Sequence, residues 1–184
     1  MELIGPRIQI RYMEPSHAEE LLDLLLRNRD FFRPFEPRRP ESNLTLEEQT
    51  RMLEETTERR LREEEYGFGI FTNDEGKLIG RCNLTQVMRR AFQNAYLGYF
   101  LDEAHNGRGL MTEAVGLVVD FAFGPGRLHR VQAAVMTTNP GSQRVLEKAG
   151  FRREGFAPNY LSIDGAWRDH HLYAITREDR EGAG

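Results

Sequence analysis

The segment at residues 101–112, which reads LDEAHNGRGLMT, restricts the possible fold more than any other part of this chain. The residues before it, 95–101, have a strand-like pattern. The residues after it carry apolar side chains at helical spacing, namely Leu110, Ala114, Leu117, Val118 and Phe121. Gly107 and Gly109 let the backbone turn tightly between the two. A strand that passes directly into a buried helix is typical of α/β folds.

The rest of the chain alternates between strand-like and helical patterns. Strands are expected at residues 8–12, 68–71, 77–84, 95–101, 128–136, 161–163 and 167–175. Helices are expected from Ser16, from Thr45 to about residue 65, from Leu110 to a stop at residues 124–127, and from Asn139 to Gly150. This order predicts an α/β (α+β) fold with a mixed central sheet of about six to seven strands and helices on both faces. The 184 residues are enough for one domain, residues 1–184.

The first two predicted helices begin with capping-box patterns. Ser16 with Glu19 opens the first helix, and Thr45 with Glu48 opens the second. The side chains expected to face inward are Leu21, Leu22, Leu25 and Leu26 in the first helix and Leu46, Leu53 and Leu61 in the second. The second helix is rich in charged residues, which we interpret as a solvated face.

Composition restricts the class of partner. The formal net charge is −4 and the pI is about 5.8, so no direct nucleic-acid binding is expected. Cys82 is the only cysteine and no Cys/His cluster has metal-ligand spacing, so neither an internal disulfide nor a metal is expected. The sequence begins without a signal-peptide pattern, and no apolar run is long enough to span a bilayer. A cytoplasmic protein without a membrane partner is therefore expected.

The turn before residue 110 has the properties of an anion site. The first N–H groups of a helix have no intrahelical acceptor, and the helix dipole adds positive potential there. Arg108 adds a cation at its edge. The dinucleotide fingerprint needs a third glycine where Thr112 stands, and the Gly-Lys-Ser/Thr of a P-loop is absent. A phosphate ligand held by another kind of turn is the functional hypothesis, and a plain strand-to-helix turn is the alternative.

Two segments resemble the GCN5-related N-acetyltransferase (GNAT) superfamily. The family's pyrophosphate motif, Gln/Arg-x-x-Gly-x-Gly/Ala, falls on positions 106–111, where Asn106 replaces Gln/Arg and Met111 replaces Gly/Ala. Residues 139–151, which read NPGSQRVLEKAGF, are similar to the family's Asn…Lys-x-Gly-Phe segment. Residues 101–114 and 160–173 resemble the branch that contains ribosomal-protein alanine N-acetyltransferases.

The resemblance implies a GNAT fold and acetyl-coenzyme A (acetyl-CoA) as the acyl donor, with no metal. The strand residues whose backbone would pair with the pantetheine arm are Tyr99, Phe100 and Leu101. The residues that would hold the pyrophosphate are Gly107, Arg108, Gly109, Leu110, Met111 and Thr112. Asn139 would hydrogen-bond the pantetheine arm.

The reaction implied is attack of a neutral amine on the thioester carbonyl. A protein α-amine has a pKa of about 7.7–8.0 and loses its proton more readily near neutral pH than lysine, whose pKa is about 10.4. In many family members, a tyrosine hydroxyl acts as the general acid at the position where this chain has Leu146. The branch instead implies Ser142 as acid or thiol ligand and Glu103 as general base. Asp102 or a water relay is left open as the base, and His105 is interpreted as a loop histidine.

The acceptor implied by the branch is the N-terminal α-amine of a protein, such as a ribosomal protein with an alanine or serine terminus. A polyamine, an amino sugar or another small primary amine is one alternative, and a non-catalytic acyl-CoA-binding sensor is another. The aromatic stretch at residues 31–35, with Tyr160 and Trp167, is expected either to line an acceptor groove or to close the core edge. The acidic helix at residues 47–65 would attract a basic protein tail. A homodimer is left open.

Overall fold

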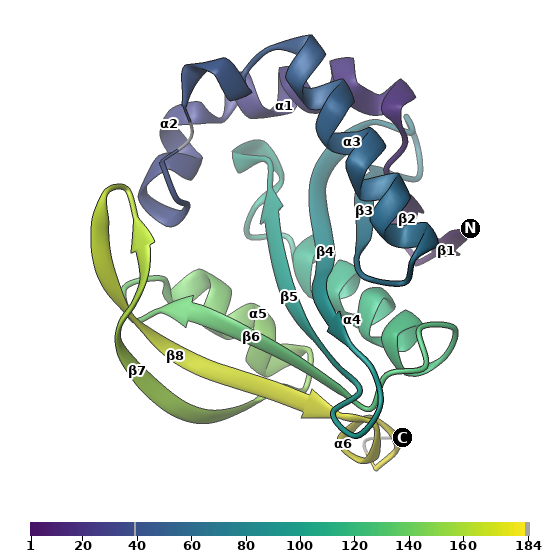
Figure 1. Ribbon diagram of the computed structural model, residues 1–184, viewed down its shortest axis with the longest axis vertical. Helices are drawn as coiled ribbons and strands as arrows, with labels where there is room; N and C mark the ends of the chain where they lie inside the picture. The colour runs from purple at the N-terminus through teal and green to yellow at the C-terminus, as the bar shows by residue number, and fades with distance from the viewer. Residues whose placement is uncertain (39, 183–184) are drawn as a thin grey trace.

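The computed structural model describes residues 1–38 and 40–182, and its strands form one eight-stranded sheet in the order β1-β2-β3-β4-β5-β6-β8-β7 (Figure 1). The strands are β1 (Glu2–Ile4), β2 (Ile8–Tyr12), β3 (Tyr66–Thr72), β4 (Leu78–Met88), β5 (Asn94–Leu101), β6 (Arg130–Met136), β7 (Arg152–Ile163) and β8 (Ala166–Thr176). The predicted α/β fold with a mixed sheet is confirmed. The strand that the prediction lacks is β1, a three-residue edge strand paired with β2.

Helices cover both faces of this sheet, as predicted (Figure 1). The helices are α1 (Ala18–Arg27), α2 (Arg29–Phe32), α3 (Leu46–Leu61), α4 (Leu110–Phe123), α5 (Pro140–Lys148) and α6 (Arg177–Glu181). Short 3-10 turns lie at Pro15–His17, Arg33–Phe35, Glu41–Asn43 and Glu103–His105. In the part of the chain that the structure describes, no helix is both long and apolar enough to cross a bilayer.

The two faces of the sheet have separate hydrophobic cores. In one core, Val118 of α4 packs with strand residues such as Phe68. In the other, Leu24 of α1 and Leu53 of α3 are fully buried and pack with Phe71. The central strands therefore bury side chains on both faces, which gives them the nearly continuous apolar runs that the sequence shows.

β5 and β6 are the only parallel neighbours in the described sheet, and their pairing is short. Only Asn94–Tyr96 of β5 is in register with Arg130–Gln132 of β6. β5 continues to Leu101 and β6 to Met136, and the strands diverge over this length (Figure 1). The last part of β5 therefore has no strand partner on the side of β6, which leaves backbone N–H and C=O groups available to a ligand.

β7 is longer than predicted, because it begins at Arg152 rather than at residue 161. It is an edge strand with mostly exposed side chains, and its pairing with β8 is interrupted twice by register shifts. The alternation that reveals a half-buried strand is therefore absent. The predicted hairpin turn between β7 and β8 is confirmed, with φ angles of 46° at Asp164 and 80° at Gly165.

The predicted cap of the first helix is wrong. The chain enters a 3-10 turn at Pro15–His17, where the Glu14 N–H donates to Nδ1 of His17 at 3.0 Å, so Ser16 lies inside the turn. A proline and a histidine that accepts a backbone hydrogen bond replace the expected box. The side chains that α1 buries are Ala18, Leu21, Leu24 and Leu25. Of the predicted inward leucines, Leu22 is partly exposed and Leu26 is 49% exposed.

The cap predicted for α3 is confirmed at Thr45, whose Oγ1 accepts a hydrogen bond from the Glu48 N–H at 3.3 Å. The predicted inward face is correct only at Leu53, because Leu46 is 49% and Leu61 is 76% exposed. Besides Leu53, α3 buries the polar residues Gln49 and Thr56, so the leucine spacing alone misplaces its buried face.

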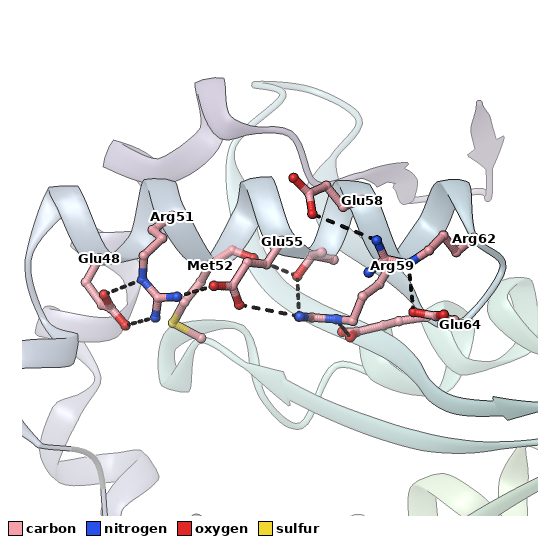
Figure 2. Close-up of polar contacts among 10 residues, drawn as sticks. Glu48, Arg51, Met52, Glu55, Glu58, Arg59, Arg62 and Glu64 are labelled. Carbon is pink, nitrogen blue, oxygen red and sulfur yellow. Dashed lines mark hydrogen bonds and ion pairs between the residues drawn. The ribbon is translucent and has the colours of Figure 1, made fainter.

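Charged side chains of α3 form a row of ion pairs along the helix (Figure 2). Arg51 forms ion pairs with Glu48 and Glu55. Arg59 forms ion pairs with Glu55 and with Glu65, the latter at 2.7 Å. This ladder supports the interpretation of a solvated face. It also means that much of the acidic charge expected to attract a basic tail already has an arginine partner.

Candidate functional site

A pocket of about 540 Å³ lies where β5 and β6 diverge. It is bounded by α2, the end of β5, the turn into α4 and the first turns of α5. The lining residues are Phe31, Phe32, Phe35, Tyr99, Phe100, Leu101, His105, Asn106, Gly107, Gly109, Leu110, Met111, Thr112, Asn139, Gly141, Ser142, Arg144, Val145 and Lys148. Ten of the twelve residues predicted for the site are in this set, and Glu103 and Arg108 are not.

The pocket reaches both faces of the sheet. Phe100 of β5 points toward α1 and α2, where its ring centroid lies 5.0 Å from that of Phe32. Tyr99, the preceding residue, points to the opposite face, where it hydrogen-bonds Ser142 of α5. All four side chains line one pocket, so the opening between the strands connects the two faces. A ligand that lies beside α4 and α5 can therefore meet a second molecule that arrives from the aromatic side.

The turn before α4 has the geometry of an anion site. Gly107 and Gly109 have φ angles of 75° and 77°, a left-handed conformation that glycine adopts readily. Gly109 is the N-cap of α4, and the Glu113 N–H donates to its carbonyl at 3.1 Å. The N–H groups of residues 110–112 therefore have no helical acceptor and remain available to an anion.

The first side chains of α4 turn away from this site. Leu110 is 8% and Met111 is 6% exposed, and both belong to the core beneath the helix. Met111 replaces a small residue of the family motif, and its burial explains why the replacement does not fill the turn. The backbone of these residues stays at the pocket while their side chains stabilise the helix.

The pocket carries positive charge. Arg144 and Lys148 of α5 both line it, and no Asp or Glu is among its described lining residues. These two cations are four positions apart on one helix, so they project from the same side. An anionic ligand such as a diphosphate is favoured in a cleft with this sign of charge. Neither Arg144 nor Lys148 was predicted to bind the ligand, although their helical spacing beside a glycine-rich turn was an available signal.

Hydroxyl groups meet at the centre of the pocket. The Tyr99 hydroxyl oxygen lies 2.8 Å from Oγ of Ser142 and 3.2 Å from the Ser142 carbonyl oxygen. Burial raises the pKa of the Tyr99 hydroxyl, and the bond to Ser142 offsets part of this effect. The pair is therefore a neutral proton donor. Leu146 is 0% exposed in the core, so it contributes no group to the pocket.

Asn139 positions Ser142. Its Oδ1 accepts a hydrogen bond from the Ser142 N–H at 3.1 Å, which caps α5 as predicted. This bond occupies Oδ1 and leaves the Nδ2 donor free of any partner among the described residues. Asn139 thus combines a capping role with a donor at the pocket wall.

Asp102 is a cap and an ion-pair partner. It is 5% exposed, its Oδ1 accepts from the Ala104 N–H at 3.2 Å, and its Oδ2 accepts from Arg27 at 3.0 and 2.9 Å. Burial by itself raises the pKa of Asp102, but the hydrogen bonds from Arg27 and Ala104 outweigh it, and the pKa lies below its ordinary value. A carboxylate held in this way is a weak proton acceptor, which argues against Asp102 as the base.

Glu103 lies between two lining residues in sequence, Leu101 and His105, but it is not itself in the pocket lining. It is exposed, it begins the 3-10 turn after β5, and Oδ1 of Asn28 accepts from its N–H at 2.9 Å. His105 lines the pocket two residues later, with Nδ1 3.7 Å from Oδ2 of Asp102. Arg108 is exposed and is not among the residues that line the pocket. No group of three or more His, Cys, Asp or Glu side chains in the described residues could hold a metal.

The aromatic stretch lines the other end of the pocket. Phe31 packs against Phe32 and Phe35, with ring centroids 5.7 and 6.3 Å apart. Tyr160 and Trp167 are not in the described lining, in contrast to the expectation that they share the groove. Trp167 is 66% exposed, and it lies in the part of β8 that extends past the pairing with β6 and pairs only with β7.

Two side chains that anchor the site carry no sequence signal of function. Arg27 and Asn28 end α1, a place where polar residues are common. In the structure Arg27 holds Asp102, while Asn28, 3% exposed, bonds the Leu24 carbonyl and the Glu103 N–H. Only the fold brings the end of α1 to the turn after β5, so residues 75 positions apart become neighbours.

A mixed α/β sheet that opens between two parallel strands, with an anion-site turn at the opening, is the architecture expected for the GNAT class of acyltransferases. A family model described as an acetyltransferase (GNAT) domain matches residues 7–152. Over 179 residues the chain is 50% identical to the probable N-acetyltransferase YjcK of Bacillus subtilis, covering 97% of this chain and 99% of that protein. It is 35% identical over 179 residues to the ribosomal protein uS5-alanine N-acetyltransferase of Escherichia coli, covering 97% and 92%.

A solved structure agrees with these relatives. RimJ of Mycobacterium smegmatis in complex with a CoA disulfide superposes with a TM-score of 0.90 at 28% identity, covering 95% of this chain and 87% of that one. The chain belongs to the GNAT acetyltransferase family, and the predicted GNAT fold and enzyme class are confirmed.

Proposed function

We propose that this chain transfers the acetyl group of acetyl-CoA to the N-terminal α-amine of a protein, such as a ribosomal protein with an alanine or serine terminus. The observation that carries the proposal is the pocket that crosses the sheet between β5 and β6. It joins a positively charged phosphate turn on one face to an aromatic wall on the other. CoA fits the first part, and an amine-bearing chain fits the second.

The donor is held mainly by backbone groups. The pyrophosphate accepts hydrogen bonds from the N–H groups of residues 110–112, and Arg144 and Lys148 add charge. The pantetheine arm runs along the unpaired edge of β5 at Tyr99–Leu101 and accepts from Nδ2 of Asn139. The complex of RimJ with a CoA disulfide supports CoA as the ligand of this fold.

In the reaction the amine nitrogen bonds to the thioester carbonyl carbon, and the C–S bond breaks with its electron pair on sulfur. An N–H of the β5 edge stabilises the oxyanion that forms on the carbonyl. The hydroxyl pair of Tyr99 and Ser142 donates a proton to the departing thiolate, and the pair then regains a proton from solvent. The proton of the amine goes to Glu103, directly or through water, and from there to solvent.

An α-amine fits this machinery better than a lysine. With a pKa of about 7.7–8.0, an appreciable fraction of α-amines is neutral near pH 7, so a solvated base such as Glu103 is sufficient. Lysine, with a pKa of about 10.4, would need a stronger base than the described pocket lining provides. The similarity to the uS5-alanine enzyme of Escherichia coli supports the same acceptor class.

A peptide panel tests this proposal. The chain is incubated with acetyl-CoA and an alanine-terminated peptide, the same peptide with a blocked N-terminus and one internal lysine, spermidine, and an amino sugar, and products are read by mass spectrometry. We expect one acetyl group on the free alanine terminus and none on the blocked peptide. Acetylation of the small amines alone would assign a small-amine transferase. CoA binding without any product would assign a sensor.

A further inference from the structure

Arg7 lies in the turn between β1 and β2 and contacts the phosphate turn, from which it is 101 positions away in sequence. Its Nη1 donates to the Arg108 carbonyl at 2.6 Å, and its Nε donates to Oε2 of Glu113 at 2.8 Å. These contacts lie on either side of Gly109 in sequence. The Cβ position of Gly109 is 3.5 Å from Nη2 of Arg7, so the guanidinium lies directly beside the turn.

The Glu113 carboxylate is enclosed by the same segment. Its Oε1 accepts from the backbone N–H of Arg7 at 2.9 Å and of Ile8 at 3.3 Å. A Cβ on Gly5 would lie 2.5 Å from this oxygen, so the glycine leaves the space that the carboxylate occupies. With 13% of its side chain exposed, Glu113 is held in one position in the first turn of α4.

Glu113 is costly for phosphate binding unless it is neutralised. A carboxylate in the first helical turn stabilises the helix through the dipole. At the same end, however, it repels any phosphate bound to the N–H groups of residues 110–112. The described pocket lining contains no Asp or Glu, so Glu113 is the carboxylate that Arg7 holds beside the turn through its bonds to Glu113 and to the Arg108 carbonyl. Arg7 cancels this charge and, through the Arg108 carbonyl, also fixes the backbone that precedes Gly109.

We propose that Arg7 is a positioning residue of the donor site. Arg7, the Glu113 carboxylate and the Arg108 carbonyl form a clamp that holds the phosphate turn in its binding conformation and screens the pyrophosphate from Glu113. The clamp rests on the proposed binding of CoA, and it assigns a role in that binding to the first turn of the chain, far in sequence from both family motifs.

The Kd for CoA, measured by calorimetry, shows how much Arg7 contributes to binding and how much of that contribution comes from neutralising Glu113. We expect Arg7→Met to raise the Kd about tenfold or more, because it leaves the Glu113 charge unpaired beside the phosphates. Glu113→Gln in the Arg7→Met background should recover part of that loss, and Arg7→Lys should fall between Arg7→Met and the wild type. Thermal unfolding of each variant shows whether it is folded at the assay temperature.

Arg180→Met is the matched control. Arg180 of α6 forms an ion pair with Asp120 of α4, with nitrogen-to-oxygen distances of 2.9 and 3.0 Å. Asp120 lies toward the far end of α4 from the turn. Its loss removes an equivalent ion pair from α4 without touching the turn, so the Kd for CoA should stay at the wild-type value. An equal loss of affinity in this control would show that any disturbance of α4 weakens binding, and the clamp would be refuted.

A donor without phosphates gives a readout that general damage would not produce. S-acetylpantetheine keeps the thioester arm and lacks the pyrophosphate, so Arg7→Met should lower kcat/KM with acetyl-CoA and leave kcat/KM with S-acetylpantetheine unchanged. Equal losses with both donors, or an unchanged Kd for CoA, would overturn the clamp alone. A wild-type chain that does not bind CoA would instead overturn the proposed function, and the clamp with it.

Discussion

At the scale of single residues, the hydroxyl pair of Tyr99 and Ser142 has the most direct chemical consequence. The distance of 2.8 Å between the two oxygens lets one proton pass through both groups to a thiolate. We expect Ser142→Ala and Tyr99→Phe each to lower kcat by about 10- to 100-fold, within the usual contribution of a general acid. The Kd for CoA should stay within about twofold, because neither side chain is assigned to the phosphates.

Steady-state kinetics and calorimetry together check this prediction. Ser162→Ala, an exposed serine on β7, is the control and should behave as the wild type. Because burial raises the pKa of Tyr99 above its ordinary value of 10.0, the wild-type rate should show no loss from ionisation of Tyr99 below that pH. Undiminished kcat in both hydroxyl variants would contradict the assignment.

Gly109 is the second position where one residue decides binding. Its φ of 77° and its place as the N-cap of α4 put its α-carbon beside the proposed diphosphate. We expect Gly109→Glu to abolish measurable CoA binding, because it adds bulk and negative charge at that point. Gly76→Glu is a control for backbone strain, since Gly76 also has a positive φ, 64°, in a turn that is open to solvent. Equal CoA affinities for the two variants would be the contrary result.

At the scale of elements, the tip of the β7–β8 hairpin holds the segment that carries the aromatic wall. Asp164 lies 3.4 Å from Arg33 and 3.5 Å from Arg38, and its N–H donates to the Glu36 carbonyl at 3.1 Å. The hairpin tip is thus tied to the chain that follows Phe35. Exposed ion pairs of this kind are weak and are screened by salt.

Asp164→Asn tests whether this tie shapes the acceptor side. The change removes the charge and keeps a residue that tolerates the φ of 46°. We expect the KM for an alanine-terminated peptide to rise about threefold at low salt and the difference to shrink at high salt. Calorimetry should show the same Kd for CoA. Asp74→Asn, in the exposed turn before β4, is the control and should change neither the KM nor the Kd. If Asp164→Asn shifted both constants, the hairpin would act on the whole site and not on the acceptor side alone.

The elements also show where sequence reasoning succeeds. The Gly107–Gly109 turn, the cap at Asn139 and the hairpin at Asp164 are each fixed by local rules of backbone geometry, and all three lie where they were predicted. The buried face of α3 and the length of β7 were misjudged, since both depend on contacts with distant parts of the chain. Local rules therefore position the site, and tertiary contacts decide which side chains complete it.

At the scale of the whole molecule, the pair of Arg27 and Asp102 ties the helices on one face to the strand that carries the pocket. Asp102→Asn should lower the free energy of unfolding by about 1–3 kcal/mol near neutral pH, as for loss of a charged hydrogen bond. The folded-state pKa of Asp102 lies below its ordinary value of 3.8, so its stabilisation is present above that pH and is lost as pH falls below it.

Urea unfolding at several pH values measures this effect. The difference between the wild type and Asp102→Asn should be largest near neutral pH and shrink as the solution becomes more acidic than pH 3.8. Asp23→Asn is the control, because Asp23 pairs with the same arginine but its side chain is 78% exposed, and it should have little effect. A difference that grows toward acid would contradict the sign of the shift.

The residues near the site that the sequence did not predict come from segments that only the folded chain brings together. The turn before α4 and the helix α5 line the same pocket, and the end of α1 contacts the residues that follow β5. The residues of the turn before α4 share one short segment, so their spacing alone predicts an anion site there. Arg7, Arg27 and Asn28 reach the site from separate segments, so only the closed sheet makes them neighbours.

The most direct test of the account is a crystal structure of the chain with CoA. We predict that the pyrophosphate oxygens lie within hydrogen-bonding distance of the N–H groups of residues 110–112 and that the sulfur lies beside the Tyr99–Ser142 pair, in the opening between β5 and β6. CoA bound at any other place, or a pyrophosphate that makes no contact with the turn before α4, would contradict it.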